Sequence, residues 1–268
     1  MKHIEIEGLR IAYERAGQGP SLVLLHGFFG DRRVWGPQLA AFSEEYEVVA
    51  WDNPGCGQSS DPPETFRMPD YARSLRGFIH ALGLERPHVL GLSFGSTLAL
   101  ELYRQSPLLP RTLVLAAAYA GWRGSLPAHV VEERLRQTIP DLDLPPDEVV
   151  AKYNSPGLLS ALAPESVLAE NARIMSDFHP SGMKPIVRAL AEANLRDVLR
   201  FIEIPTLLLY GDKDVRSPIS VGQALHAQIP RSKLVVIPGA GHVSNLEAPE
   251  RFNAEVRSFL RGAGPSLR

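Results

Sequence analysis

The sequence has almost no cysteine, no long hydrophobic run and no excess of positive charge. Its 268 residues contain one cysteine, Cys56, which excludes an internal disulfide framework and a zinc site built on cysteines. Lys and Arg number 28 against 30 Asp and Glu, with no basic block, so the charge pattern of a nucleic-acid-binding protein is missing. No apolar run approaches the roughly 20 residues that cross a bilayer. The alternating start, residues 1–7, predicts no signal peptide, and we expect a cytoplasmic protein without membrane insertion.

Two kinds of strand pattern are present. Residues 4–16 alternate apolar and polar positions around Glu7-Gly8, which predicts a β-hairpin. Later strands are short and nearly continuously apolar, which is typical of a parallel sheet covered by helices on both faces. These runs are 22–26, 48–52, 89–92, 112–116, 206–210 and 234–237. Helical patterns alternate with them at 69–83, 94–105 and 249–261, so the sequence predicts a doubly wound α/β domain.

One stretch, residues 119–194, interrupts the alternation of strands and helices. It contains no strand pattern, and its short helical pieces are separated by prolines such as Pro127, Pro140 and Pro164. A loop of that length without structure is unusual in a compact domain. The sequence therefore predicts a core of residues 1–118 and 195–262, a helical cap at 119–194, and a flexible tail at 263–268.

The strongest motif is Gly-Leu-Ser-Phe-Gly, residues 91–95. It follows an apolar run directly and opens the helical pattern 94–105. A sharp turn from strand to helix strains the backbone of the central serine, and bulky residues two positions away would clash. The hydroxyl is then exposed at the carboxyl end of the sheet, beside a helix N-terminus that favours negative charge. Ser93 is therefore the candidate nucleophile.

A nucleophilic serine needs a base, and the base needs an orienting acid. The loop after 206–210 carries two acids, of which Asp214 is preferred over Asp212 because it lies further along the loop. Among eight histidines, His242 alone combines a loop after a strand, small flanking residues and a position after both serine and acid. Residues 116–122, after the strand run 112–116, include no carboxylate, which also favours Asp214.

These segments resemble the α/β-hydrolase superfamily, and specifically its lidded, esterase-like members, along nearly the whole chain. The matching segments are His-Gly-Phe at 26–28, Asp-Asn-Pro-Gly-Cys-Gly-Gln-Ser at 52–59, Gly-Leu-Ser-Phe-Gly at 91–95, Gly211-x-x-Asp214, and Gly241-His242. The resemblance implies a mostly parallel twisted sheet with helices on both faces and an inserted helical lid. It also implies that Ser93 is the nucleophile, His242 the general base and acid, and Asp214 the orienting carboxylate.

The same resemblance suggests roles for residues around the triad. The backbone N–H groups of Phe28 and Phe94 would form the oxyanion hole, which typically stabilises a transition state by a few kcal/mol. His26 would shape its loop without acting in catalysis. Asp52 with the two nearby glycines, Gly55 and Gly57, would fix a tight turn.

Several apolar side chains are expected near the serine and predict a mostly apolar pocket for an acyl or alcohol group. They are Phe28, Phe29, Phe94, Trp122, Tyr153, Leu158, Leu159, Phe178, Val215 and Val243. The formal net charge of -2 fits a small substrate that is uncharged or weakly charged. Oligomeric state is left open by the sequence.

A serine at the centre of the turn 91–95 argues against epoxide hydrolases and haloalkane dehalogenases, which use a carboxylate nucleophile. We expect a serine hydrolase that cleaves a carboxylic ester or lactone through an acyl-enzyme at Ser93, with no metal and no organic cofactor. Three alternatives stay open: a carbon–carbon bond hydrolase of ring-cleavage products, an aminopeptidase similar to proline iminopeptidases, and a small-molecule receptor without turnover. The aminopeptidase is disfavoured because those enzymes have Gly-Gly-Pro-Gly where this chain has Gly-Phe-Phe-Gly at 27–30.

Overall fold

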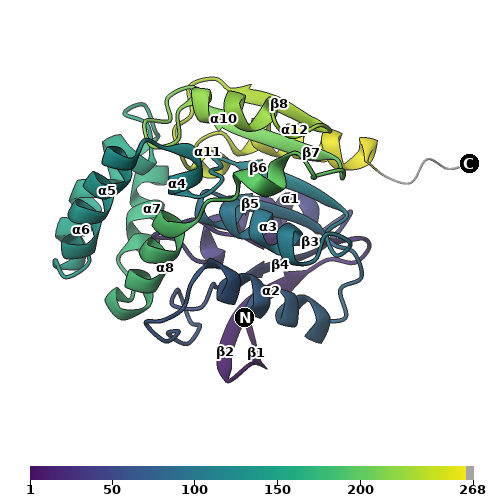
Figure 1. Ribbon diagram of the computed structural model, residues 1–268, viewed down its shortest axis with the longest axis horizontal. Helices are drawn as coiled ribbons and strands as arrows, with labels where there is room; N and C mark the ends of the chain where they lie inside the picture. The colour runs from purple at the N-terminus through teal and green to yellow at the C-terminus, as the bar shows by residue number, and fades with distance from the viewer. Residues whose placement is uncertain (264–268) are drawn as a thin grey trace, which may run out of the picture.

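An eight-stranded sheet forms the centre of the computed structural model, which describes residues 1–263 (Figure 1). The strand order is β1-β2-β4-β3-β5-β6-β7-β8; β2 pairs antiparallel with β1 and β4, and every other pairing is parallel. The strands are β1 (Lys2–Ile6), β2 (Leu9–Ala16), β3 (Ser21–Leu25), β4 (Glu47–Trp51), β5 (His88–Leu92), β6 (Thr112–Ala116), β7 (Thr206–Gly211) and β8 (Ser232–Ile237).

The sequence predictions for the sheet are confirmed. The alternating segment forms the hairpin β1–β2, and the six apolar runs form β3 to β8. Strands β5, β6 and β7 are buried at every residue, because helices cover both faces of the sheet there. Most residues of strand β8 are only partly buried, as expected for a strand at the edge of the sheet.

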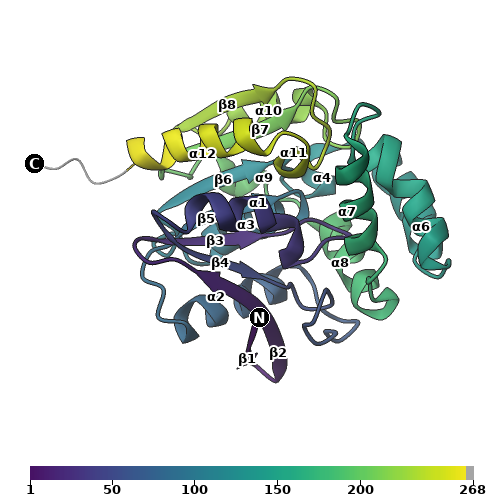
Figure 2. The same ribbon diagram turned by 180° about the vertical axis from the view of Figure 1, so that it is seen from behind.

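Helices cover both faces of this sheet. Helices α2, α3 and α10 lie on the face seen in Figure 1, and α1 and α12 pack together on the opposite face, seen in Figure 2. The predicted helices 69–83, 94–105 and 249–261 correspond to α2, α3 and α12. The helices outside the long segment between β6 and β7 are α1 (Gly36–Phe42), α2 (Met68–Ala81), α3 (Phe94–Gln105), α10 (Ile219–His226), α11 (Ser244–Glu247) and α12 (Pro249–Gly262), with a short 3-10 turn η1 (Arg32–Trp35).

The long segment between β6 and β7 is entirely helical or irregular, and it lies beside one end of the sheet (Figure 1). Its elements are α4 (Trp122–Ser125), α5 (Ala128–Asp141), α6 (Pro146–Tyr153), η2 (Asn154–Leu158), α7 (Glu165–Met175), α8 (Pro180–Glu192) and α9 (Arg196–Leu199). We call residues 119–194 the inserted segment. Of the predicted tail, residues 264–268 lie outside the described residues.

Within residues 1–263, no helix combines the length and the apolar character needed to cross a membrane.

Candidate active site

Ser93 occupies a strained turn between β5 and α3. Its backbone has φ 54° and ψ -110°, a left-handed conformation that is uncommon for a residue with a side chain. The flanking glycines are required by close packing: a Cβ at Gly91 would lie 2.3 Å from the carbonyl oxygen of Gly95, and one at Gly95 would lie 2.1 Å from that of Leu25. The motif is therefore a steric requirement of the turn, which leaves Ser93 at the carboxyl end of the sheet.

Asp214 and His242 form a hydrogen-bonded pair at the ends of neighbouring strands β7 and β8. The Nδ1 atom of His242 lies 2.8 Å from Oδ2 of Asp214, and both residues are buried. The other carboxylate oxygen, Oδ1, accepts hydrogen bonds of 2.8 Å from the backbone N–H groups of Arg216 and Ser217. These bonds fix the carboxylate, and its bond to Nδ1–H selects the imidazole tautomer whose Nε2 can accept a proton.

Asp212, the alternative acid on the same loop, has a different role. Its Oδ1 accepts a hydrogen bond of 2.6 Å from the backbone N–H of Gly239, and its side chain is exposed. The structure thus brings Asp214, and not Asp212, to the histidine.

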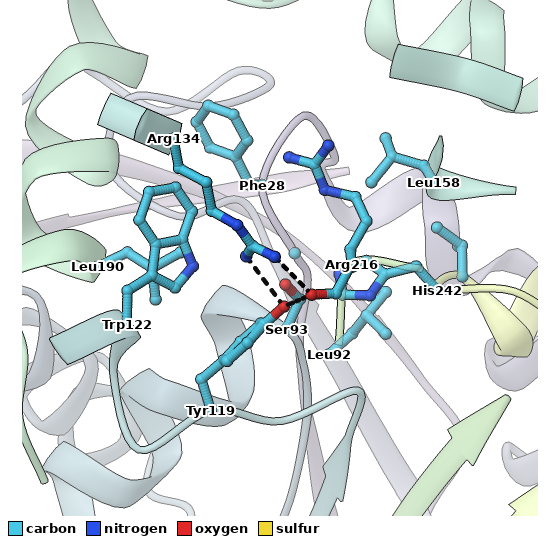
Figure 3. A pocket seen from close by; sticks show the side chains of 12 residues that line it. Phe28, Leu92, Ser93, Tyr119, Trp122, Arg134, Leu158, Leu190, Arg216 and His242 are labelled. Carbon is cyan, nitrogen blue, oxygen red and sulfur yellow. Dashed lines mark hydrogen bonds between the residues drawn. The ribbon is translucent and has the colours of Figure 1, made fainter. Parts of the chain in front are cut away.

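Ser93 and His242 line the same pocket, shown in Figure 3. The cavity is small, about 30 Å³, which is room for only a few water molecules. Its lining residues come from the core and from the inserted segment alike: Gly27, Phe28, Leu92, Ser93, Tyr119, Trp122, Arg134, Leu158, Leu190, Arg216, His242 and Val243. The inserted segment therefore forms part of the wall of this pocket.

Of the two predicted oxyanion-hole residues, Phe94 directly follows Ser93 in the chain and Phe28 lines the same pocket. Phe94 is the first residue of α3, so its N–H has no acceptor within the helix. Phe28 lines the pocket and lies in a turn closed by a 3.2 Å hydrogen bond from Gly30 N–H to the Gly27 carbonyl. The next residue, Phe29, has a positive φ of 61°, so this turn is strained as the serine turn is.

The predicted substrate-binding residues divide into those at the pocket and those beside it. Phe28, Trp122 and Val243 line the pocket together with Ser93. Phe29 packs instead into an aromatic cluster, with ring centroids 5.0 Å from Tyr153 and 5.8 Å from Phe178.

Val215 does not lie among the lining residues, because its side chain points to solvent and is 70 % exposed. The neighbouring Arg216 lines the pocket in its place.

The pocket is not as apolar as the sequence suggested, because Arg134 and Arg216 both line it. Sequence reasoning missed them, together with the lining residues Tyr119 and Leu190. A signal existed for Arg216, which lies two positions after Asp214 on a loop already chosen as catalytic. None existed for Arg134, since one cation among several polar residues on a surface helix predicts only a solvated face.

His26 and Asp52 shape the loops beneath the site. His26 accepts a 2.9 Å hydrogen bond at Nε2 from the Asn53 N–H and donates from Nδ1 to the Gly27 carbonyl at 2.8 Å. Burial lowers the pKa of His26, which keeps the imidazole neutral in this bridging role. Asp52 accepts the backbone N–H groups of Arg32 and Gln58, each at 2.8 Å, and its burial raises its pKa.

Glu247 joins the histidine loop to the inserted segment. Its carboxylate accepts the backbone N–H of Gly241 at 2.8 Å and that of Ser160 at 3.1 Å. A further backbone bond of 3.1 Å runs from the Val243 N–H to the Leu158 carbonyl. Burial raises the pKa of Glu247. These bonds and the shared pocket lining place the inserted segment directly against the histidine loop.

In the described part of the chain, no group of three or more His, Cys, Asp or Glu side chains is arranged to hold a metal ion.

The fold is that of a known class of enzymes. Residues 22–255 match the alpha/beta hydrolase family, so the chain belongs to that family and is a hydrolase. It is 30% identical to a putative carbamate hydrolase, RutD, of a Caulobacter species, with 96% of this chain and 97% of the relative covered. It is 28% identical to a 3-oxoadipate enol-lactonase of Acinetobacter baylyi, with 90% and 89% covered.

Among solved structures, the chain is similar to a thermophilic esterase of Thermogutta terrifontis. The TM-score is 0.90 at 28% sequence identity, and the match covers 98% of this chain and 99% of the esterase.

Proposed function

We propose that this hydrolase cleaves a small carboxylic ester or lactone through an acyl-enzyme on Ser93. One observation carries the proposal: Ser93, on its strained turn, shares a small pocket with His242, whose Nδ1 is 2.8 Å from the buried carboxylate of Asp214. A nucleophile, a base and an orienting acid are the parts that acyl transfer needs.

The reaction takes place in two halves. Nε2 of His242 removes the proton of the Ser93 hydroxyl as the oxygen attacks the ester carbonyl, and the protonated imidazole then gives that proton to the leaving alcohol. Water attacks the acyl-enzyme in the second half, again with His242 as base, and releases the acid and the free serine. The sum is ester plus water to acid plus alcohol; for a lactone, both products are one molecule. Asp214 stabilises the imidazolium in both halves.

Negative charge on the carbonyl oxygen would be stabilised by the backbone N–H groups of Phe28 and Phe94. Phe94 follows Ser93 in the chain and Phe28 lines the same pocket, and the N-terminus of α3 adds a favourable dipole. Removal of one such donor in comparable sites costs about 2.7–4 kcal/mol of transition-state stabilisation.

The inserted segment would serve as the lid. Trp122, Arg134 and Leu158 contribute pocket lining from it, and the cavity of about 30 Å³ is too small for an ester. Opening of this segment would admit the substrate, and closure would exclude water from the reacting centre.

An ester or lactone is favoured over other substrates by the chemistry of the site and by the relatives. The pocket has apolar walls of Phe28, Trp122 and Leu158 around the serine. Similar proteins include an esterase and an enol-lactonase by name.

The proposal is tested with a panel of short p-nitrophenyl esters, lactones and peptide amides. The wild-type protein should hydrolyse esters or lactones, and Ser93→Ala and His242→Ala should each abolish turnover. His226→Ala is the matched control, since this histidine is exposed, is bonded to the Ser232 hydroxyl and does not line the pocket. Loss of activity in His226→Ala but not in His242→Ala would overturn the assignment of the base. Tight ligand binding without turnover of any ester, lactone or amide would overturn the enzyme mechanism.

A further inference from the structure

Two arginine side chains reach the catalytic pocket from different elements. Arg134 comes from α5 of the inserted segment, and Arg216 from the loop that carries Asp214 (Figure 3). Arg134 donates to the Tyr119 hydroxyl at 3.2 Å and to the Arg216 carbonyl at 2.8 Å, and it lies over the Trp122 ring at 5.4 Å. Its acceptors are therefore neutral oxygens, and no carboxylate of residues 1–263 is bonded to it.

Arg216 has fewer polar partners than Arg134. Within the described chain its guanidinium donates no hydrogen bond and forms no ion pair, and it lies over the Tyr153 ring, 5.3 Å from the centroid. Burial, and then repulsion from Arg134, lower the pKa of Arg216. Arg216 is half-buried at the wall of the pocket, so its guanidinium has lost part of its hydration and has no anion beside it in return.

The nearest candidate counter-ion is already committed. Asp214 Oδ1 accepts the backbone N–H groups of Arg216 and Ser217, and Oδ2 accepts Nδ1–H of His242. Its charge supports the imidazolium that forms during acyl transfer, so it is not free to form a bidentate pair with a guanidinium. The pocket thus combines two cations with no carboxylate of its own for them.

We propose that Arg134 and Arg216 bind an anionic group of the substrate, so that the enzyme prefers esters or lactones whose acyl chain ends in a carboxylate. The inference rests on the proposed function and names its substrate class. A planar guanidinium matches a carboxylate in a bidentate geometry, and its bonds to a charged acceptor are about twice as strong as neutral ones. Arg216 is the principal contact, because Arg134 is held by Tyr119 and by the Arg216 carbonyl.

The arrangement also sets the size of the preferred substrate. Both arginines line the same small cavity as Ser93 and His242, so a carboxylate bound there is separated from the reacting carbonyl by only a few carbon atoms. Short half-esters of dicarboxylic acids have this form. The apolar walls would contact the intervening methylene groups, and the guanidinium of Arg216 would bind the terminal carboxylate.

The test compares matched esters with and without the charge. The probes are the monoethyl esters of succinate, glutarate and adipate, each against the ethyl ester of the straight-chain acid with the same number of acyl carbons. We expect kcat/KM of at least one half-ester to exceed that of its neutral partner about tenfold or more. Arg216→Met, which keeps the length and loses the charge, should lower kcat/KM about 10- to 100-fold more for that half-ester than for its neutral partner, as expected for a charge-assisted bond.

Two controls make the outcomes distinct. Arg200→Met removes an exposed arginine that lies over the Phe201 ring at 4.8 Å, outside the catalytic pocket, and should change neither substrate. Arg216→Lys should recover part of the preference. Equal kcat/KM for charged and neutral esters in both wild type and Arg216→Met would overturn the anion site while the esterase proposal stands. Absence of turnover with every ester would overturn the proposed function itself.

Discussion

Gly182 of α8 and Gly55 of the loop after β4 lie in backbone contact. A Cβ added at Gly182 would come 2.4 Å from the Cα of Gly55, and one at Gly55 would come 2.6 Å from the carbonyl oxygen of Gly182. Gly55 also has a positive φ of 90°. Gly55, in the segment 52–59, therefore does more than form a turn, because it lets the inserted segment approach the core closely.

Gly182→Ala should destabilise the protein by about 1–3 kcal/mol, the usual effect of forcing a methyl group into a packed interface. Helix propensity alone would favour alanine in α8 by up to about 1 kcal/mol, so a net loss identifies the contact with Gly55 as the cause. Urea unfolding measures the change. Gly36→Ala is the control, since Gly36 is helical with open space around it, and this variant should be as stable as the wild type or more so. Equal stability of Gly182→Ala and wild type would contradict the close approach.

Asp214→Asn should lower kcat by about 10²–10⁴-fold with little change in fold. The amide oxygen can still accept the N–H groups of Arg216 and Ser217, which leaves the amide NH2 facing His242 Nδ1. That arrangement favours the imidazole tautomer with its proton on Nε2, which cannot act as the base. Steady-state kinetics on a reactive ester measures the loss.

The control for this variant is Asp212→Asn, on the same loop. Its amide oxygen can keep the bond from Gly239 N–H, and we expect kcat to match the wild type. A larger loss in Asp212→Asn than in Asp214→Asn would mean that the acid of the triad has been misassigned.

The pH dependence of stability should carry a contribution from His88. Burial first, and then the charge of Arg111, lower the pKa of His88 from 6.5 to about 4. The unfolded chain therefore binds a proton between pH 6.5 and 4 that the folded chain excludes, so stability falls as pH decreases through that window. At about 1.4 kcal/mol per pKa unit, the effect is of order 3 kcal/mol.

His88→Asn should flatten this slope, since the Asn amide can still bond the Thr112 hydroxyl now 2.8 Å from Nδ1 but does not titrate. Unfolding midpoints measured from pH 7 to pH 4 give the slopes. The matched control is His226→Asn, an exposed histidine that makes the same kind of bond, 2.8 Å, to the Ser232 hydroxyl. An unchanged slope in His88→Asn would show that the acid sensitivity arises elsewhere.

Sequence patterns predicted the sheet well because its strands have a physical signature of their own. Strands β5, β6 and β7 are buried on both faces, so each is a continuous apolar run that no surface element imitates. Ser93 could be predicted for a similar reason. Its turn requires Gly91 and Gly95 on steric grounds, so the local sequence specifies the local backbone.

The walls of the pocket could not be predicted in the same way. Arg134 and Arg216 meet through the tertiary fold. Helix periodicity does not say which cavity the side chain of Arg134 enters, and the position of Arg216 after Asp214 places it near the triad without fixing the direction of its side chain. The same limit explains Val215, which was expected at the pocket because it follows Asp214 but points to solvent. Side chains along an irregular loop do not alternate in a fixed pattern, so the sequence could not say which neighbour of Asp214 faces the pocket. In the structure it is Arg216.

The most direct test of the account is covalent labelling of the nucleophile. A fluorophosphonate transfers its phosphonyl group to an activated serine with loss of fluoride, and peptide mass spectrometry then locates the adduct. We predict one adduct, on Ser93, formed in step with loss of esterase activity and absent in Ser93→Ala. An adduct on another residue that abolishes activity, or undiminished hydrolysis by Ser93→Ala, would contradict the assignment of Ser93 as the nucleophile.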